Sequence, residues 1–326
     1  MILRSFIRWG RKALIETSNR LKNTFDPPVV VLIYHRVTTL REDSQLLAVS
    51  PDNFRDHLRY LKGNFPLLRF EDDWSAVAEP SVVVTFDDGY ADNALEALPI
   101  MEEVGVPATF FISTGTLGTL REFWWDDLER IILAGGPFPA CFTLVDGRLN
   151  RSWPTAILAE RRVLYEDLHQ LMKKIEPDRR DMWISQLHDW AGTGAEGRET
   201  HRPLTNNELQ CLAASRWVTI GAHTVSHAPL ATLSRPKQRE EITESKLQLE
   251  KLLGKEITVF SYPFGGKCDY TRTSAGLCRE AGFVKAAANF PGLAHRWTDP
   301  YRIPRRLVRN WPLEMFAENM ERFWVS

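Results

Sequence analysis

The feature that most constrains this chain is an alternation of short apolar runs with helical patterns. The apolar runs have the length of strands, and they are "VVVLIYH" (29–35), "VVVTFDD" (82–88), "ATFFIS" (108–113), "WVTIGAHT" (217–224), "ITVFSYPFG" (257–265) and "VKAAANF" (284–290). Strands that alternate with helices form parallel βα units, and strands that are apolar throughout are buried on both faces of a sheet. The sequence therefore predicts an α/β fold, a distorted (β/α) barrel of about seven parallel strands.

The helices between these runs carry recognisable end signals. Pro51 stands at the first turn of a predicted helix, where its missing N–H costs nothing. Thr205 and Glu208 have the spacing of a capping box in front of another helix. Gly105 and Gly254 follow predicted helices, as glycine commonly does at helix C-termini.

One segment breaks the alternation. Residues 118–203 lie between the third and fourth predicted strands and are far longer than a usual connection. We interpret this segment as a helical insertion, and its tryptophans are Trp124, Trp125, Trp153, Trp183 and Trp190. Tryptophan stacks on sugar rings, but it is also a core residue, which is the better expectation for most of them.

The predicted organisation has three parts. A basic amphipathic segment occupies residues 1–26, the barrel with its insertion occupies 27–312, and a C-terminal helix or tail occupies 313–326. Six basic residues against one acid give residues 1–25 a net charge of +5. This segment suits a helix on an anionic membrane face, and the alternative is a helix docked on its own domain or a frayed end.

The N-terminus lacks the continuous apolar stretch of a secretory signal, and no apolar run reaches the ~20 residues of a membrane span. The four cysteines show no CxxC spacing, which is compatible with a reducing compartment. We therefore expect a cytoplasmic protein, with peripheral contact at the inner membrane face as the variant. The net charge of −1 gives no field that would attract nucleic acid.

Polar or aromatic residues follow several predicted strands directly. In barrels of this kind the chemistry gathers at the C-terminal ends of the strands. The residues at these positions are His35, Asp87, Asp88, His223 and Phe264. We therefore expect them to share one rim, although they are far apart in sequence. Taken alone, Asp87-Asp88-Gly89 could also be ordinary turn chemistry that merely ends a strand.

His223 and His227 are four residues apart in "GAHTVSHAPL" (221–230). On a helical turn this spacing places both imidazoles on one side. Two imidazoles and one carboxylate are a common ligand set for Zn²⁺ or a related cation, and three protein ligands leave a position open, as in catalytic sites. Many such histidine pairs are surface pairs, but this one begins where a strand ends, opposite the paired aspartates. One aspartate could then neutralise the cation while the other acts as general base.

The motifs "TFDDG" (85–89) and "HTVSH" (223–227) resemble those of the polysaccharide deacetylases, the family 4 carbohydrate esterases with the nodulation-deacetylase homology domain. The resemblance implies that Asp87 is the base and that Asp88, His223 and His227 bind one divalent ion. Zn²⁺ is the first expectation, and Co²⁺, Ni²⁺ or Mn²⁺ would also suit. The family's third motif resembles "FSYPFG" (260–265), which implies that the Phe264 N–H donates to the oxyanion.

The chain departs from the family pattern in two ways. The family often has an arginine that holds the base at the position of Ser261, and Arg305 or Arg306 could replace it; we choose Arg305. The late Leu-x-His motif that supplies the general acid is not evident, and His295 is a poor match for it. His35 ends the first strand instead, which resembles the permuted members that include the poly-N-acetylglucosamine deacetylases. His35 is therefore the candidate acid, and a buried structural histidine is the alternative.

The resemblance implies a metal-dependent hydrolase that removes an N-acetyl group from an amino sugar in a polysaccharide, an oligosaccharide or a lipid-linked glycan. O-deacetylation is chemically close, and deformylation of a lipid-linked sugar would suit the basic N-terminus. A non-catalytic glycan-binding barrel is the alternative of another class. The remaining histidines lie on helical or loop patterns that indicate no functional role, and they are His57, His169, His188 and His201.

Overall fold

The computed structural model describes residues 22–23, 25–134, 137–147, 149–194 and 196–325. The basic segment predicted for residues 1–26 lies almost wholly outside the described residues. Within the described part of the chain, no helix combines the length and the apolar character needed to cross a membrane.

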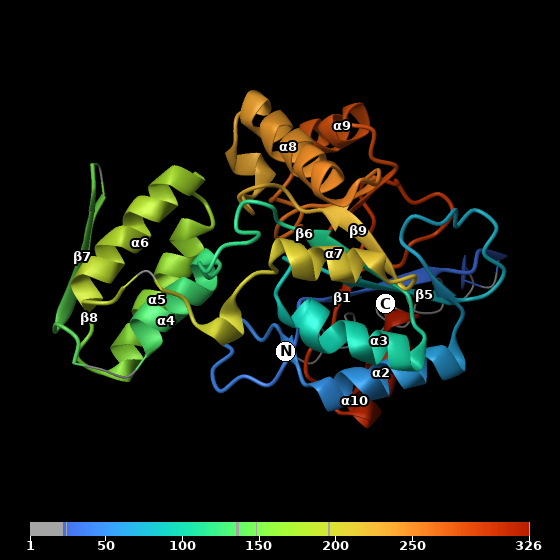
Figure 1. Ribbon diagram of the computed structural model, residues 1–326, viewed down its shortest axis with the longest axis horizontal. Coiled ribbons are helices and arrows are strands. Elements are labelled where there is room, and N and C mark those ends of the chain that lie inside the picture. Colours follow the sequence, from blue (N-terminus) through green and yellow to red (C-terminus); the bar gives the residue numbers. More distant parts are fainter. Residues whose placement is uncertain (1–21, 24, 135–136, 148, 195, 326) are drawn as a thin grey trace, which may run out of the picture.

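Seven strands form one parallel sheet that curls toward a barrel (Figure 1). In chain order they are β1 (Val29–Tyr34), β5 (Ser81–Phe86), β6 (Ala108–Ile112), β9 (Val218–Ala222), β10 (Val259–Ser261), β11 (Lys285–Ala287) and β12 (Arg306–Leu307). Their order across the sheet is β11-β10-β9-β6-β5-β1-β12, and β4 (Leu67–Leu68) pairs with β5 outside this path. The predicted α/β fold with a distorted parallel barrel is confirmed.

The segment that contains β12 nearly closes the ring of strands. Ala287 of β11 forms a parallel bridge with Ile303, and three residues later Arg306 pairs with Leu32 of β1. One short stretch of chain thus contacts both ends of the sheet. The sequence did not predict β12, because a two-residue strand is too short to show a periodic pattern.

Side chains of β1 and β5 alternate between two hydrophobic clusters. Val30 and Val82 belong to the large cluster that includes residues of the surrounding helices, whereas Val31 and Val83 belong to a small inner cluster. Because successive side chains point to opposite faces of a strand, Asp87 continues the inner row of β5 past its end. The alternation therefore directs this carboxylate to the mouth of the ring.

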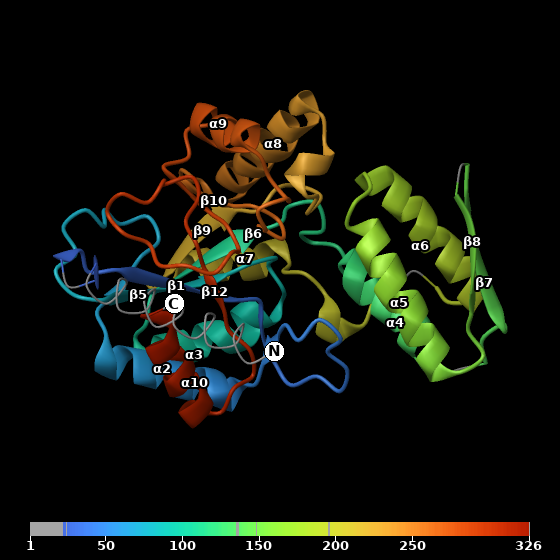
Figure 2. The same cartoon turned by 180° about the vertical axis from the view of Figure 1, so that it is seen from behind.

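Helices cover the outside of the ring (Figures 1 and 2). Those that follow or precede its strands are α2 (Pro51–Asn64), α3 (Leu98–Val104), α7 (Asn206–Ala214), α8 (Arg235–Leu253), α9 (Arg272–Glu280) and α10 (Leu313–Phe323). The helix predicted ahead of Gly105 begins with a π-helical turn, Asn93–Ala97, that leads into α3. The short elements are β2 (Arg36–Val37), β3 (Ala48–Val49) and the 3₁₀ turns Glu199–His201 and Leu230–Thr232.

The expected helix ends are present. The Thr205 hydroxyl accepts a hydrogen bond from the Glu208 N–H, and the Glu208 carboxylate accepts one from the Thr205 N–H. Gly105 and Gly254 end α3 and α8 in the left-handed conformation, with φ of 75° and 64°. Glycine tolerates this conformation because it has no Cβ.

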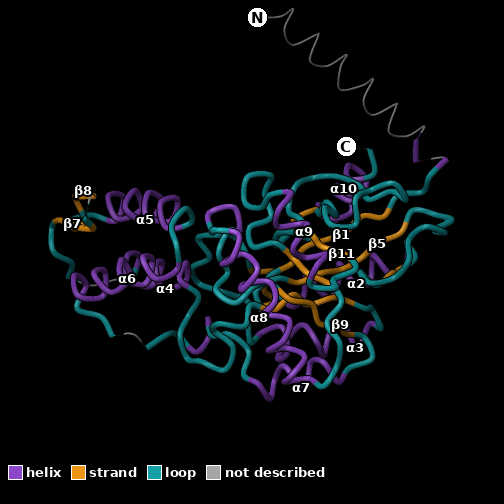
Figure 3. The backbone as a smooth tube through the Cα atoms, turned by 90° about the horizontal axis from the view of Figure 1, so that it is seen from above, coloured by secondary structure: helices purple, strands orange, loops and turns teal. Residues whose placement is uncertain are grey.

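The insertion forms a lobe beside the barrel (Figures 1 and 3). Its elements are α4 (Trp124–Leu133), β7 (Cys141–Asp146), β8 (Leu149–Pro154), α5 (Leu158–Met172) and α6 (Pro177–Ala191). Four of its tryptophans, Trp124, Trp125, Trp153 and Trp183, are buried in the core of this lobe. They are core residues, as expected for most tryptophans of this chain. The antiparallel hairpin β7–β8 was not predicted, because "CFTLVD" is one short strand-like run inside a helical segment.

Candidate active site

The side chains expected at one rim surround a single cavity of about 280 Å³. They come from the ends of β1, β5, β9 and β10, and they are His35, Asp87, Asp88, His223, His227 and Phe264. Arg305 does not line this cavity but lies behind Asp87. The structure thus brings all of the sequence-predicted site residues together.

Asp88, His223 and His227 form a compact buried cluster. The Asp88 Oδ1 atom lies 3.2 Å from the Nε2 atom of His227 and 3.5 Å from that of His223. One ligand atom from each residue lies within 4.8 Å of the other two. The three side chains could therefore reach a single metal ion.

The protonation states of these three side chains suit the binding of a cation. The His223 Nδ1 atom lies 2.7 Å from the Ser261 carbonyl oxygen, so Nδ1–H donates to it and Nε2 keeps a lone pair toward Asp88. Burial lowers the pKa of His227 to about 4, although Asp88 opposes this shift. Burial raises the pKa of Asp88, but the His223 and His227 imidazoles beside it more than offset this and hold the pKa well below its ordinary value, so Asp88 is ionised. Two imidazole nitrogens and a carboxylate suit Zn²⁺ or a similar divalent ion.

The histidine pair does not lie on a helical turn, so that part of the prediction is wrong. Residues 223–229 follow β9 as irregular backbone, in which Thr224 has φ of 65° and His227 has φ of 51°. Asp88, directly after β5, has φ of 78°. Such left-handed conformations cost on the order of 1–3 kcal/mol each for residues other than glycine. They concentrate here because these sharp turns bring the three side chains together.

Arg305 holds Asp87 through two parallel hydrogen bonds. The Arg305 Nη1 and Nη2 atoms donate to Asp87 Oδ1 and Oδ2 at 2.7 and 2.6 Å. The Ser261 hydroxyl donates to Asp87 Oδ2 at 3.1 Å and accepts from Arg305 Nη2 at 2.8 Å. Burial raises the pKa of Asp87, but Arg305 and His223 more than offset it and hold the pKa below its ordinary value. Asp87 is therefore an ionised carboxylate in a fixed orientation.

Replacing Arg305 by methionine is expected to destabilise the protein. Arg305 is only 1% exposed, and its removal would leave the Asp87 carboxylate buried without its counter-ion. Breaking a buried ion pair in this way costs about 3–5 kcal/mol of unfolding free energy. Urea denaturation would measure the loss. Arg306→Met is the neighbouring control, at a half-buried side chain, and an equal loss there would contradict the special role of Arg305.

Phe264 presents an unusual backbone conformation to the cavity. Its φ is 59°, and among the described residues its N–H has no hydrogen-bond acceptor. Its ring lies 4.8 Å from that of His227, between centroids. The next residue, Gly265, has φ of 62°, and a Cβ there would come within 2.6 Å of the Asn289 nitrogen, so only glycine fits. The turn therefore holds Phe264, whose N–H has no partner among the described residues, at the wall of the cavity.

The two candidate acids lie at opposite ends of β1. His35 follows the last residue of β1 and lines the cavity, and burial lowers its pKa against the opposing influence of Asp88 and Asp87. The His295 Nδ1 atom lies 3.2 Å from the carbonyl oxygen of Asp26, a residue that precedes β1. A six-residue strand spans roughly 20 Å, so His295 is far from the cavity.

The insertion supplies cavity residues that the sequence did not reveal. They are Trp125, His169, Gln170 and Lys173. The Trp125 ring lies 4.6 Å from the ring of His227, and its Nε1–H donates to the Tyr90 hydroxyl at 2.7 Å. Helical periodicity placed these side chains on helices, but it could not indicate that α4 and α5 dock at the mouth of the barrel.

The sequence pattern of the family described as polysaccharide deacetylase matches residues 75–138 and 190–285. The matched parts contain Asp87 and all three residues of the cluster. The chain belongs to the polysaccharide deacetylase family. The family pattern skips residues 139–189, which contain the hairpin β7–β8, α5 and most of α6.

Two kinds of relatives accompany this match. YxkH of Bacillus subtilis (strain 168), a polysaccharide deacetylase by name, is 19% identical over 299 residues, which cover 89% of this chain and 75% of YxkH. The structure of the Streptococcus pyogenes deacetylase PplD in complex with acetate has a TM-score of 0.57 at 16% identity and covers 90% of this chain and 99% of PplD. IcaB from Ammonifex degensii has a TM-score of 0.56 at 17% identity, with coverage of 92% and 98%. At such identities the structures show a shared fold.

Proposed function

We propose that this polysaccharide deacetylase removes the acetyl group from the nitrogen of an amino sugar in a polysaccharide, an oligosaccharide or a lipid-linked glycan. The observation that carries the proposal is the pairing of two buried aspartates at one cavity. Asp88 lies within the cluster with His223 and His227, whereas Asp87 is held by Arg305. Family membership supports the substrate class.

One divalent cation, for which Zn²⁺ is the first candidate, would be held by Asp88, His223 and His227. When bound, such a cation supplies Lewis acidity, which polarises a carbonyl group and lowers the pKa of water. Three protein ligands leave room for substrate or water. The His223 Nδ1–H bond to the Ser261 carbonyl would keep this ring oriented toward the cation.

Asp87 is the proposed general base. It is ionised, and Arg305 and Ser261 fix its orientation. Each carboxylate oxygen has two lone pairs, so Asp87 can still accept a proton from an attacking water molecule. This arrangement suits a general base, because the guanidinium orients the carboxylate without occupying all of its acceptor sites.

The Phe264 N–H is the proposed oxyanion donor. As the amide carbonyl becomes tetrahedral, negative charge develops on its oxygen, and a preorganised N–H that faces this position stabilises the transition state. A donor with no partner in the resting protein costs no reorganisation when it is used. The left-handed turn at Phe264 and Gly265 would hold it in place.

His35 is the proposed general acid, placed on the first strand as in the permuted members of the family. It would donate a proton to the departing amine, because an amine anion is not a viable leaving group. An alkoxide leaves more easily, so an ester depends less on this proton. His35→Ala should therefore slow N-deacetylation about 10²-fold or more and slow hydrolysis of nitrophenyl acetate much less.

The pH profile and a second histidine provide the checks on His35. The acid must be protonated, and burial lowers the pKa of His35. The rate of amide hydrolysis should therefore fall as the pH rises through this lowered pKa, below the ordinary histidine value of about 6.5, and this limb should vanish in His35→Ala. His295→Ala should be near neutral. Equal losses of His35→Ala on amide and ester would indicate a structural role, and a large amide-specific loss in His295→Ala would move the acid there.

The proposal is tested by acetate release. The purified protein should release acetate from N-acetylated sugar oligomers in a reaction that a chelator stops and a divalent cation restores. An O-deacetylase would release acetate only from O-acetylated sugars, and a deformylase would release formate. A non-catalytic glycan-binding barrel would bind the sugar and release neither.

A further inference from the structure

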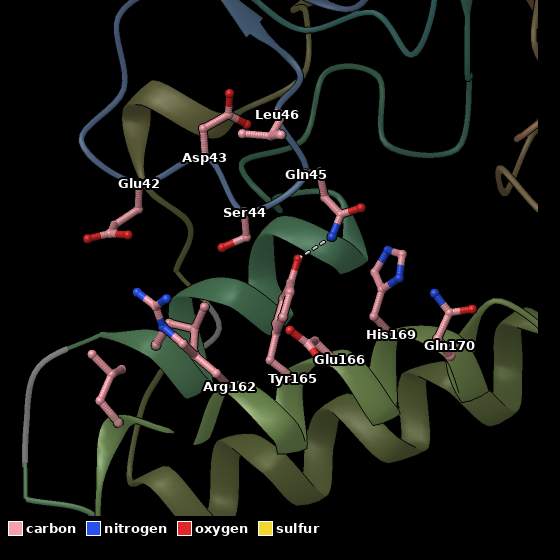
Figure 4. Close-up of a pocket in the computed structure, with 12 residues that line it drawn as sticks. Glu42, Asp43, Ser44, Gln45, Leu46, Arg162, Tyr165, Glu166, His169 and Gln170 are labelled. Carbon is pink, nitrogen blue, oxygen red and sulfur yellow. Dashed lines mark hydrogen bonds between the residues drawn. The ribbon is translucent and has the colours of Figure 1, made fainter. Parts of the chain in front are cut away.

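A second cavity adjoins the candidate active site, and Figure 4 shows the side chains that line it. It has a volume of about 490 Å³ and lies between the loop of residues 42–46 and helix α5 of the insertion. Gln45, His169 and Gln170 line both cavities, so the two spaces meet at these side chains. Its volume falls in the range of roughly 300–1,000 Å³ that small-molecule sites occupy.

The polar wall of this cavity contains both groups that only accept hydrogen bonds and groups that only donate them. Glu42 and Glu166 carry carboxylates, which only accept, and Arg162 carries a guanidinium, which only donates. The Gln170 amide does both. Sugar hydroxyls also donate and accept, so a glycan can satisfy such a wall where an apolar ligand cannot.

The apolar wall is also suited to a sugar. Leu46 and Leu158 line the same cavity, although they are 61% and 45% exposed. The C–H face of a sugar ring and the methyl of an N-acetyl group could cover these side chains. Burying each exposed apolar surface is favourable by about 25 cal/mol per Å².

His169 stands at the junction of the two cavities. Its ring stacks on Trp124 at 5.1 Å, which fixes its orientation. Burial lowers its pKa to about 4, so the ring is neutral at physiological pH. Among the described residues, neither ring nitrogen has a hydrogen-bond partner. In Figure 4 His169, Gln170 and Gln45 lie together beyond Tyr165, whose hydroxyl accepts from Gln45 Nε2 at 2.5 Å.

We propose that this second cavity is a sugar subsite and that the substrate is a glycan of at least two residues. The acetylated residue would occupy the active site, and its neighbour would lie along α5, with His169 as a positioning residue and Arg162 and Glu166 as hydrogen-bonding residues. The proposal rests on the proposed function. Helix α5 lies within the segment that the family pattern skips, so the α5 wall of this subsite belongs to the insertion of this chain.

A pair of charge-balanced variants tests the subsite. Arg162→Ala/Glu166→Ala removes one positive and one negative side chain, four residues apart, from the second cavity only. Glu318→Ala/Arg322→Ala removes the same two charges at the same spacing from α10, where they form an exposed ion pair. The substrates are N-acetylglucosamine oligomers of one to five residues, and the readout is kcat/KM for acetate release.

In the wild type we expect kcat/KM to rise at least tenfold from the monomer to the longer oligomers. The Arg162→Ala/Glu166→Ala variant, called the α5 variant, should lose most of this rise. Two hydrogen bonds to charged groups are together worth about a factor of ten or more in kcat/KM. The control Glu318→Ala/Arg322→Ala, called the α10 variant, should keep the full rise. The subsite is refuted if the α5 variant keeps the full rise or if the wild type shows no dependence on length.

Calorimetric binding separates this inference from the proposed function. Pentamer binding to Asp87→Asn reports the subsite without turnover, so it remains informative if no oligomer releases acetate. A loss of at least tenfold in affinity on adding the α5 changes supports the subsite. Equal affinity with and without the α5 changes, or no binding of the pentamer, overturns it.

Discussion

Replacing His227 by alanine is expected to remove both the bound divalent cation and the deacetylase activity. His227 is one of the three side chains proposed to hold the cation, and its Nε2 atom is 3.2 Å from the carboxylate of Asp88. Two remaining ligands would hold the cation far more weakly. Metal content per chain after dialysis and acetate release under saturating substrate are the two measurements.

Thermal unfolding provides an independent readout of the same variant. A ligand that binds only the folded state raises the melting temperature by mass action. Added Zn²⁺ should therefore raise the melting temperature of the wild type and leave that of His227→Ala unchanged. A variant that keeps one cation per chain, or that Zn²⁺ still stabilises, would show that the assigned ligands are wrong.

Replacing Asp87 by asparagine should leave the cation in place and reduce turnover. Asparagine keeps the shape of the side chain and one acceptor for Arg305, but it cannot take up a proton at neutral pH. General-base catalysis is worth about 10²–10⁴-fold, so kcat should fall by that factor. Some loss of stability is also expected, because the Arg305 guanidinium would remain buried without a full counter-ion.

Two further variants separate the base from its surroundings. Ser261→Ala removes one hydrogen bond to Asp87 but leaves the carboxylate and Arg305, so its effect on kcat should be much smaller. Asp88→Asn should lose the cation. If Asp87→Asn loses the cation and Asp88→Asn retains it, the two aspartates have the opposite roles.

Local patterns predicted most of the barrel because each βα unit repeats the same signals. The strands of the sheet, except the two-residue strands β4 and β12, coincide with apolar runs, and the glycines that end α3 and α8 adopt the expected left-handed conformation. The insertion was less predictable. Its hairpin and helices form a separate core. Their arrangement does not repeat a pattern seen elsewhere in the chain, so the βα units gave no guide to it.

Sequence reasoning found the candidate metal ligands but not how they converge. The spacing of His223 and His227 suggested a helical turn, whereas left-handed residues in a loop bring them to Asp88. His169 could not be found at all. It lies on an amphipathic pattern of α5, and only the docking of α5 against the barrel brings it to the cavity.

The most direct test of the account is a metal titration of the chelator-treated protein. Divalent cation is added in steps, and acetate release from N-acetylated sugar oligomers is measured at each step together with bound metal. The account predicts that activity rises in proportion to bound metal and levels off at one cation per chain. Full acetate release at less than a tenth of an equivalent, or a fully loaded cluster that releases no acetate, would contradict it.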